Sequence, residues 1–391
     1  MIPLEEALET VMNSVFKTGT ETIPCLLALD RILAENVSTD IDMPPFNRAS
    51  VDGFACRKSE LDHDLEIIET IPAGKIPEKA IGEDQCSRIM TGAVVPAGAD
   101  CVVMVEDTEI VPSGRVRFKA LYLKENIAFR GEDVKKGAVL LGSGKMIKPQ
   151  DIAVLASAGK TFVTVSKMPA VAVISTGSEL VEPSVFPAGS QVRNINAYQL
   201  LAQIERAGAA GKYYGIAKDD EEETLQIVEK AISENDLILI TGGVSMGDFD
   251  FVPDVLQRAG VRILFTRVAV QPGKPTTFGI HNKTIVFGLP GNPVSTFMMF
   301  ELLVRPLICG MMESDWQPVV TRLRMNEGYT RKHSDRMALI PVKITGEFDV
   351  SPVEIHGSAH ITALSDADGI ISLPVGMNTI EKGKIVSVRQ I

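Results

Sequence analysis

The chain has 391 residues, 45% apolar and 23% charged, which is the composition of a soluble globular protein of roughly two to four domains. Its net charge of −11 argues against nucleic-acid binding, which requires a basic surface, but a local basic pocket could still bind a small anion. The five cysteines are scattered and show no C-x-x-C spacing, which predicts free thiols in a reducing compartment and argues against a structural zinc site.

The N-terminal stretch "MIPLEEALETVMNSVFK" has glutamates where a signal peptide would need positive charge. The apolar run "STFMMFELLVRPLICGMM" is interrupted by Glu301 and Arg305, so no membrane helix of about 20 residues is expected. The chain is therefore predicted to be cytoplasmic, without nucleic-acid or membrane partners.

The first helix is expected after Pro3, where an apolar stripe precedes Gly19. A second short helix is expected around Leu26 to Glu35. From about residue 46 to 141 the pattern is that of short strands and turns, with a hairpin turn at "PSG", 112 to 114. Helical periodicity returns in "PQDIAVLASAG" at 149 to 159, so one domain is interrupted by another.

Residues 169 to 312 alternate between apolar strands and amphipathic helices. This alternation predicts a parallel α/β sheet covered on both faces, and ligands of such sheets bind at the carboxyl ends of the strands. The remainder, 313 to 391, has the composition of a small terminal β domain.

Four of the strands in this section lead into unusual loops, which should lie at one edge of the sheet. These loops are "TGSE" (176 to 179), "TGGVSMGDFD" (241 to 250), "QPGKP" (271 to 275) and "LPGNP" (289 to 293).

The last of these loops predicts an anion site. Asn292 is expected at a helix N-cap and Pro293 at the first helical position, where free N–H groups and the helix dipole favour negative charge. Lys274 and Arg267 add positive charge nearby. The alternative remains open, because most helix starts of this kind bind only water.

The acidic residues at the same edge predict a magnesium site. Mg²⁺ generally takes one or two carboxylates together with substrate phosphates. The candidates are Glu179, Asp219, Asp248 and Asp250, whereas Asp220 to Glu223 are better explained as acids in a first helical turn. Glycine-rich turns and solvated acids after strands are a plainer alternative for 241 to 252.

Other enzyme classes lack their signatures in this sequence. There is no P-loop and no G-x-G-x-x-G fingerprint, which excludes kinase and dehydrogenase readings of the α/β section. No nucleophile and base pairing is visible. The five histidines, each expected to be structural or exposed, are His63, His281, His333, His356 and His360.

Seven stretches together resemble one family. They are "PPFNRASVDGFA", "RIMTGAVVPAGAD", "RGEDVKKG", "STGSELV", "TGGVSMGDFDFV", "QPGKPTTFG" and "GLPGNPVS". They occur in the order found in molybdopterin molybdenumtransferases, the MoeA-type enzymes of molybdenum cofactor biosynthesis, to which the gephyrin C-terminal domain also belongs. The resemblance extends from the first helix to the last strand.

The resemblance implies an α/β multidomain fold. It comprises an elongated helical domain (1–45 and 142–168), a β-rich insertion (46–141), a central parallel α/β domain similar to molybdopterin adenylyltransferases (169–312) and a C-terminal β domain (313–391). It also implies a reaction in which adenylylated molybdopterin and molybdate bind with Mg²⁺, AMP is released, and molybdenum is inserted into the dithiolene. A homodimer with shared active sites is expected.

The resemblance and the loop chemistry together assign the site residues. Catalytic roles are expected for Asp52, Thr91, Asp133, Glu179 and Asp250, and magnesium binding for Glu179, Asp248 and Asp250. Substrate binding is expected for Asp219, Gly242, Gly243, Ser245, Arg267, Gln271, Pro272, Gly273, Lys274, Pro290, Gly291, Asn292 and Ser358. Arg267 and Gln271 stand where some relatives carry lysine, so Lys274 is expected to bear more of the anion binding.

Two alternatives remain open from the sequence. A molybdopterin adenylyltransferase would resemble only residues 169 to 312 and would consume ATP. A non-catalytic pterin-binding or scaffold protein would have no use for the complete set of acids.

Overall fold

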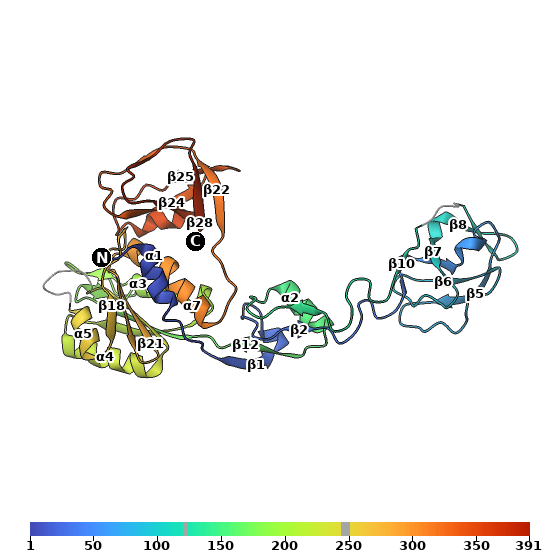
Figure 1. Cartoon of the computed structure of the whole chain (residues 1–391), viewed down its shortest axis with the longest axis horizontal. Coiled ribbons are helices and arrows are strands. Elements are labelled where there is room, and N and C mark those ends of the chain that lie inside the picture. The colour runs from blue at the N-terminus through green and yellow to red at the C-terminus, as the bar shows by residue number, and fades with distance from the viewer. Residues whose placement is uncertain (120–123, 244–250) are drawn as a thin grey trace. The chain divides into compact units, whose positions relative to one another are not determined.

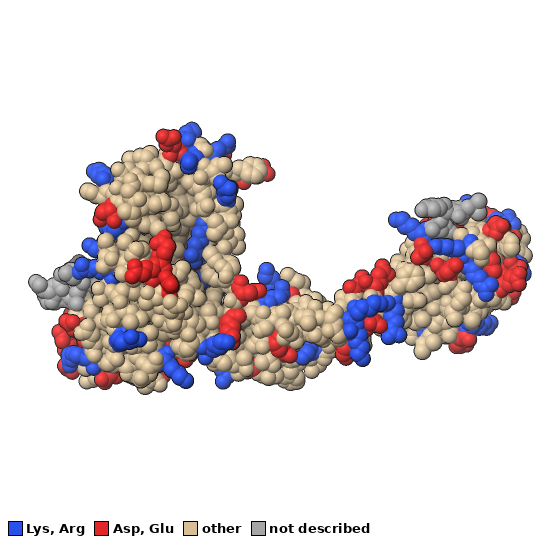
Figure 2. Space-filling model, viewed as in Figure 1, with Lys and Arg blue, Asp and Glu red and all other residues tan. Residues whose placement is uncertain are grey.

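The computed structural model describes residues 1–119, 124–243 and 251–391. They form two compact units, which are drawn in Figure 1. The larger unit consists of Met1–Glu35, Ser143–Lys148 and Phe162–Ile391, and the inserted unit of Asn36–Gly142 and Pro149–Thr161. In Figure 2, basic and acidic side chains are interspersed over the visible face of each unit.

A six-stranded sheet forms the centre of the larger unit. In spatial order its strands are β16 (Ala210–Ala217), β13 (Ala170–Thr176), β17 (Leu237–Thr241), β21 (Thr284–Leu289), β20 (Thr277–His281) and β18 (Arg262–Phe265). The first four are parallel, as predicted, but β20 pairs antiparallel with both β21 and β18. The prediction of a wholly parallel sheet is therefore wrong on one side. There a tight hairpin turn with Asn282 at φ 53° joins β20 to β21, and it leaves no room for the helical crossover that parallel strands need.

Alternate residues of the central strands face two different cores. Val171 and Val173 of β13 lie in one, and Ala172 and Ile174 lie in the other. The first core is covered by α1 (Leu4–Met12), α3 (Asn196–Arg206) and α6 (Pro293–Met299), and the second by α4 (Glu221–Glu234) and α5 (Val252–Arg258). Burial on both faces explains why these strands are continuous apolar runs.

The helix that follows β21 is the most apolar of the larger unit. Its segments are α6, the π-helical η4 (Phe300–Val304) and α7 (Arg305–Met311). By length and composition Pro293–Met311 could cross a membrane, with a mean hydropathy of 1.5, so the expectation drawn from its two charged residues is wrong on this point. However, 78% of its most apolar window is buried inside the protein, as in a core helix that is apolar all round.

The helix expected at Leu26 to Glu35 is not formed. Only a 3₁₀ turn, η1 (Cys25–Leu27), is present, because the following backbone pairs with distant segments. Leu33 N donates to Lys145 O at 2.9 Å, and Ser166 N donates to Ile32 O at 2.8 Å. In addition, β1 (Thr20–Pro24) pairs with β12 (Phe162–Ser166). Residues 1–45 and 142–168 are therefore less helical than the elongated helical domain that the resemblance implies.

The last part of the chain is a β domain, as predicted. Its main strands are β22 (Val320–Met325), β24 (Met337–Ile344), β25 (Asp349–Pro352), β26 (Gly369–Leu373) and β28 (Ile385–Gln390), and its shorter elements are β23 (Tyr329–Thr330), β27 (Thr379–Ile380) and the 3₁₀ helix η5 (Ile361–Asp366). β19 (Val270–Gln271) joins this sheet by pairing in parallel with β24 at Met337 and Ala338. The "QPGKP" loop is therefore anchored to the terminal domain.

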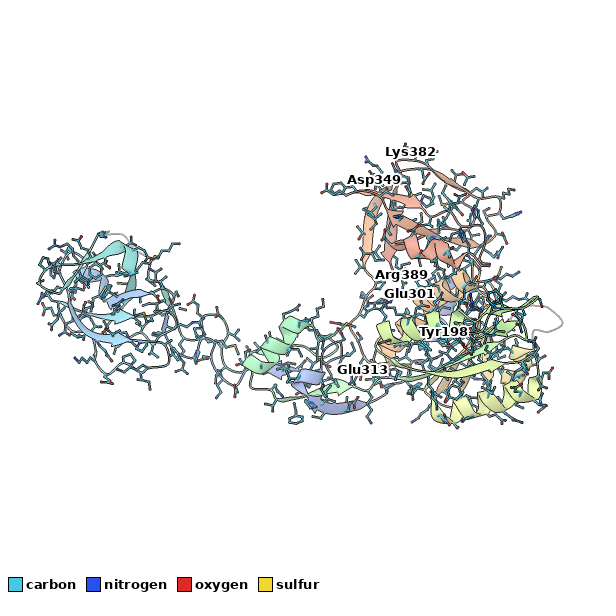
Figure 3. The ribbon with its side chains drawn as sticks, turned by 180° about the vertical axis from the view of Figure 1, so that it is seen from behind. Tyr198, Glu301, Glu313, Asp349, Lys382 and Arg389 are labelled. Carbon is cyan, nitrogen blue, oxygen red and sulfur yellow. The ribbon has the colours of Figure 1, made fainter. Side chains whose placement is uncertain are left out.

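A buried ionic cluster links the apolar helix to its neighbours. The carboxylate of Glu301, 1% exposed, accepts hydrogen bonds from Gln203 at 2.8 Å, from Arg305 at 3.0 Å and from Arg206. Arg389 of β28 donates to the backbone oxygen of Glu301 at 2.5 Å, and Figure 3 shows the two residues side by side. The cluster thus joins α3, the apolar helix and the terminal β domain.

The inserted unit is built from short strands. Its four-stranded sheet has the order β5 (Glu66–Ile71), β6 (Gln85–Ile89), β4 (Gly53–Cys56) and β7 (Cys101–Met104). Smaller pairs are β2 (Val37–Ser38) with β11 (Val139–Leu141), β3 (Arg48–Ala49) with β10 (Ile127–Ala128), and β8 (Thr108–Ile110) with β9 (Val116–Phe118), and α2 (Pro149–Ser157) also belongs to this unit. The hairpin predicted at 112 to 114 is confirmed, with Gly114 at φ 80°. All five cysteines of the chain are free and buried.

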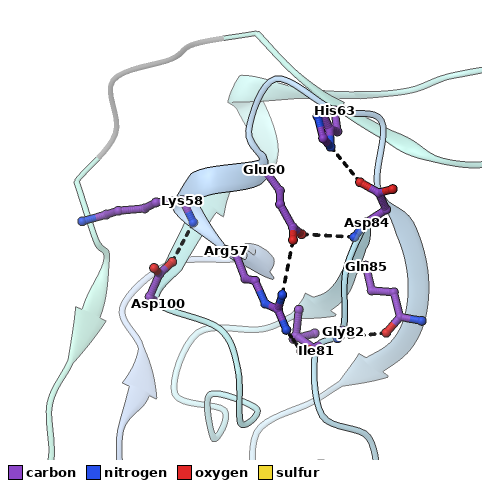
Figure 4. Close-up of polar contacts among 9 residues, drawn as sticks. All are labelled: Arg57, Lys58, Glu60, His63, Ile81, Gly82, Asp84, Gln85 and Asp100. Atoms are coloured by element: carbon purple, nitrogen blue, oxygen red, sulfur yellow. Dashed lines mark hydrogen bonds and ion pairs between the residues drawn. The ribbon is translucent and has the colours of Figure 1, made fainter.

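A polar cluster lies at one end of the four-stranded sheet (Figure 4). The Glu60 side chain, 10% exposed, accepts from Asp84 N at 3.2 Å and Arg57 Nη1 at 3.4 Å. His63 Nδ1 lies 2.7 Å from Asp84 Oδ1. This hydrogen bond, and then the charge of Asp62, raise the pKa of His63. His63 therefore has a structural partner, as expected for it.

Glu301→Ala should destabilise the larger unit by about 3 kcal/mol, because it leaves buried cationic and amide groups without their acceptor. Urea unfolding followed by the fluorescence of Trp316, the single tryptophan, measures this loss. Glu205→Ala, at an exposed position of α3, is the matched control and should change the free energy of unfolding by less than about 0.5 kcal/mol. Equal losses in the two variants would contradict the role of the cluster.

Candidate functional site

Five loops meet at the carboxyl edge of the parallel strands. The pairings Thr176 with Ala217, and Thr241 with Leu289, align the ends of β13, β16, β17 and β21. Thr277, the first residue of the antiparallel β20, pairs with Gly288, so the segment from β18 to β20 reaches the same edge. The strand ends that lead into the four predicted loops therefore lie at one edge, and the loop after β16 is a fifth; of the loop 241 to 250 the structure describes only residues 241 to 243.

The glycines after β17 are required by the local packing. Gly242 and Gly243 have φ of 97° and 61°. A Cβ atom at Gly242 would lie 2.5 Å from Thr176 O, and one at Gly243 would lie 2.8 Å from Val252 Cγ2. A Cβ at Gly291 would be 3.6 Å from Gly242 Cα, so the loops after β17 and β21 approach backbone to backbone. Close approach within the fold therefore accounts for these glycines without any ligand.

The loops after β13 and β16 are tied together. Ser178 N donates to the Asp219 carboxylate at 3.0 Å, and Asp219 N donates to Ser178 Oγ at 3.1 Å. Beyond them, β14 (Leu180–Val181) pairs with β15 (Val192–Arg193). Exposed Glu179 and Ser178 line a depression of about 580 Å³ together with residues 188 to 191. Asp220 caps α4 by accepting from Glu223 N at 2.8 Å, which supports its structural reading.

Two cations come from the segment between β18 and β20. Arg267 is half-buried and Lys274 is exposed, and neither forms an ion pair within the described residues. The loop is held by Val268 N and Thr276 N, which both donate to Lys274 O at 3.0 Å. Gly273, at φ 115°, leaves no room for a side chain, because a Cβ would lie 2.5 Å from Met299 Sδ. Pro272 follows Gln271 through a cis peptide bond.

The start of α6 completes the edge. Asn292 is the N-cap and Pro293 the first helical residue, as predicted, although the Asn292 side chain makes no capping hydrogen bond. Val294 N donates to Ser358 O at 3.1 Å. One of the N–H groups expected to be free is therefore occupied. The same bond brings Ser358, which was expected to bind substrate, to the "LPGNP" loop.

Some residues that shape this edge were missed from the sequence. Asn196, Thr241 and Thr296 form hydrogen bonds to the "LPGNP" backbone. The signal was present in the sequence, since "RNIN" places two asparagines at the start of a helix and both β13 and β17 end in threonine. Small polar residues at the end of an apolar strand indicate a backbone contact beyond it.

In the inserted unit, the structure brings two predicted residues together. Thr91 N and Thr91 Oγ1 donate to Asp52 Oδ1 at 2.6 and 2.7 Å, although the residues are 39 positions apart. These bonds, the backbone one first, lower the pKa of Asp52. Asp133 is exposed, its amide donates to Met43 O at 3.0 Å, and no hydrogen bond joins it to Asp52 or Thr91 in the described structure.

Three predicted residues, Ser245, Asp248 and Asp250, lie outside the described residues. Within the described ranges no group of three or more metal-binding side chains gathers. The magnesium site expected from Glu179, Asp248 and Asp250 therefore stays a prediction.

Comparison with known families identifies the chain. Residues 2–159 match the "MoeA N-terminal region (domain I and II)", 172–309 the "Probable molybdopterin binding domain", and 324–391 the "MoeA C-terminal region (domain IV)". The molybdopterin molybdenumtransferase of Bacillus subtilis strain 168 is 35% identical over 99% of this chain and 93% of its own length. That of Staphylococcus epidermidis is 36% identical over 99% of this chain and 95% of its own length. The chain belongs to the MoeA family.

Solved structures support the same conclusion. Two structures of the MoeA protein of Pyrococcus horikoshii align over 100% of this chain, with TM-scores of 0.85 and 0.87 and sequence identities of 32% and 29%. The two alignments cover 99% and 100% of the respective solved chains. The likeness to MoeA structures therefore extends over the whole chain, beyond the central α/β domain.

Thr91→Val should raise the pKa of Asp52, but only in part, because the backbone N–H remains. Since the folded-state pKa is lowered, the pair stabilises the fold above the ordinary value of 3.8, and this contribution is lost as the pH falls through the lowered pKa. Carbon NMR of aspartate-labelled protein measures the titration. Thr91→Ser keeps the hydroxyl and should titrate like the unmodified protein, and an unchanged pKa in Thr91→Val would rule out the side-chain bond.

Proposed function

We propose that this MoeA-family chain hydrolyses the phosphate link of adenylylated molybdopterin, releases AMP and inserts molybdate-derived metal into molybdopterin. The observation that carries the proposal is the meeting of five loops at the carboxyl edge. These loops carry two cations without ion-pair partners among the described residues, two acids and the start of a buried helix. We also propose that the activity is cytoplasmic. The proposed domains are 1–45 with 142–168, 46–141, 169–312 and 313–391.

The positive groups of the edge suit a substrate rich in phosphate. Lys274 is exposed on a loop fixed from both sides, so its ammonium group can reach an anion while its backbone stays in place. Arg267, half-buried, offers a planar guanidinium that matches a phosphate or oxyanion. The start of α6 adds a positive dipole end. Each group would stabilise negative charge as the link is hydrolysed.

The acids of the edge suit Mg²⁺. Glu179 is exposed and has no ion-pair partner in the described part of the chain, and its oxygens are ligands that Mg²⁺ prefers. We propose that Glu179, Asp248 and Asp250 hold the ion. When bound, it would supply positive charge to the phosphate oxygens.

Purified protein supplied with adenylylated molybdopterin, molybdate and Mg²⁺ tests the function. The expected products are AMP and metal-loaded cofactor, formed without ATP. Consumption of ATP would instead indicate an adenylyltransferase, and binding without product would indicate a pterin-binding protein.

Lys274→Ala should weaken binding of adenylylated molybdopterin by about tenfold or more, because it removes a charge-assisted hydrogen bond of roughly 1.5–3 kcal/mol. Calorimetry in low and high salt measures this, and the affinity of the unmodified protein should fall as salt is added. Lys283→Ala, in the exposed hairpin turn at the opposite edge of the sheet, is the matched control and should bind normally. Unchanged affinity in Lys274→Ala would show that Lys274 does not bind the anion and that "PGKP" serves only as a rigid turn.

We further propose a homodimer in which each active site takes residues from both subunits. Asp52 and Thr91 belong to the inserted unit, whereas Lys274 and Glu179 belong to the larger one. The family resemblance favours pairing across subunits, and a symmetric dimer would then contain two equivalent sites.

Asp52→Ala and Asp250→Ala homodimers should each be nearly inactive, but mixing them should restore AMP release in part. A mixed dimer has one site with both lesions and one with neither. Native mass spectrometry confirms the exchange of subunits. Complete exchange without recovery of activity would show that each site comes from one chain.

A further inference from the structure

One buried side chain joins three elements at the carboxyl edge. Asn196, at the start of α3, is 8% exposed. Its Nδ2 donates to Thr241 Oγ1 at 2.8 Å and to Gly291 O at 2.7 Å. Because Thr241 ends β17 and Gly291 follows β21, this amide connects a helix, a strand and the "LPGNP" loop.

The directions of these hydrogen bonds are fixed by chemistry. Gly291 O can only accept, so the Asn196 atom that faces it must be the nitrogen. Thr241 Oγ1 donates to Pro290 O at 3.0 Å, and Thr296 Oγ1 donates to the same oxygen at 2.5 Å. The carbonyl groups of Pro290 and Gly291 are thus both turned into the fold.

The orientation of the carbonyls fixes the orientation of the next N–H groups. In a trans peptide the C=O and the following N–H point in opposite directions. The bonds after Pro290 and Gly291 are both trans, since the cis bonds of the described chain lie at Pro44 and Pro272. We call the hydrogen bonds from Asn196, Thr241 and Thr296 to these two carbonyls the clamp. The N–H groups of Gly291 and Asn292 therefore point away from the clamp, and both residues are exposed.

The clamp leaves one polar atom without a partner. Asn196 Oδ1 is buried and accepts no hydrogen bond from the described residues. A buried unsatisfied oxygen destabilises a fold, so Asn196 is not a purely stabilising residue. Holding the Gly291 carbonyl inward, and donating to the Thr241 hydroxyl that holds the Pro290 carbonyl, is a role that accounts for its presence.

We infer that Asn196, with Thr241, is a positioning residue that orients the N–H groups of Gly291 and Asn292 toward the anionic part of the substrate. This inference rests on the proposed function for the identity of the anion. The clamp itself depends only on the hydrogen bonds above. Free N–H groups beside a helix start suit a phosphate or oxyanion.

The chain offers closely matched variants. Thr241→Val removes the bridging hydroxyl at nearly constant shape, and Thr241→Ser keeps it. Asn196→Asp replaces both N–H donors with an oxygen. Asn194→Asp makes the same change at a residue that is 1% exposed and bonds to Ser175 and Tyr213 rather than to the loop.

Hydrogen exchange in the absence of ligand tests the clamp. Peptides covering residues 289 to 296 should exchange faster in Asn196→Asp and Thr241→Val than in the unmodified protein. Thr241→Ser and Asn194→Asp should leave their exchange unchanged. Unchanged exchange in both clamp variants, or an equal increase in Thr241→Ser, would overturn the clamp whatever the protein's function.

Substrate binding then tests the positioning role. In the same two variants the Kd for adenylylated molybdopterin should rise about tenfold or more, with wild-type affinity in Thr241→Ser and Asn194→Asp. Faster exchange with unchanged affinity would overturn the positioning role. If the unmodified protein binds no adenylylated molybdopterin, both the proposed function and the positioning role are contradicted. The hydrogen-exchange result still shows, independently of function, whether the clamp holds the loop.

Discussion

The larger unit depends on burying a charged residue in its most apolar helix. Pro293–Met311 lies against the central sheet, and Glu301 in its π-helical turn cannot be buried without partners. Side chains from α3 and from the helix itself supply them, while Arg389 of the terminal domain bonds to the backbone beside it. One helix thus begins at the candidate site and bonds at its middle, through Glu301, to the terminal domain. This arrangement explains how Ser358 comes to lie against the helix start.

At the carboxyl edge, the backbone rather than the side chains sets the geometry. Gly242 and Gly243 lie close against Thr176 and Val252, and Gly291 approaches Gly242. Threonine and asparagine side chains then orient the peptide groups that remain exposed. Side chains such as Lys274 need only extend from a scaffold that is already rigid, which is the arrangement expected when a site must hold several phosphate oxygens at once.

The sequence predicted the features that depend on local patterns. Alternating apolar and amphipathic stretches identified the strands and helices of residues 169 to 312, and Asn-Pro identified the start of α6. It failed where tertiary pairing decided the structure. The stretch Leu26 to Glu35 has a helical composition, but its backbone bonds to segments more than 100 residues away. The strand Thr277–His281 was missed, because five residues that turn back after only two loop residues show little periodicity.

The site was predictable to different extents for physical reasons. Loops that follow parallel strands must share an edge, so the grouping of Glu179, Lys274 and Asn292 followed from topology. The bond between Thr91 and Asp52 could not be derived from spacing, because the sheet of the inserted unit has no simple repeat. Asn196 escaped notice because a buried amide looks like any helix cap in sequence.

The acidic charge of the chain is compatible with the anionic substrate that we propose for it. The net charge of −11 is spread over 391 residues, and salt screens charges beyond about 8–10 Å. An anion at the carboxyl edge therefore responds mainly to the groups within that distance. Within the described residues, Lys274 and Arg267 have no ion-pair partners and offset the charges of Glu179 and Asp219 at this edge. The local charge is thus less unfavourable to an anion than the net charge of the whole chain. The Mg²⁺ ion proposed above would add positive charge at the same edge, and would so reduce the repulsion between the carboxylates and a phosphate group.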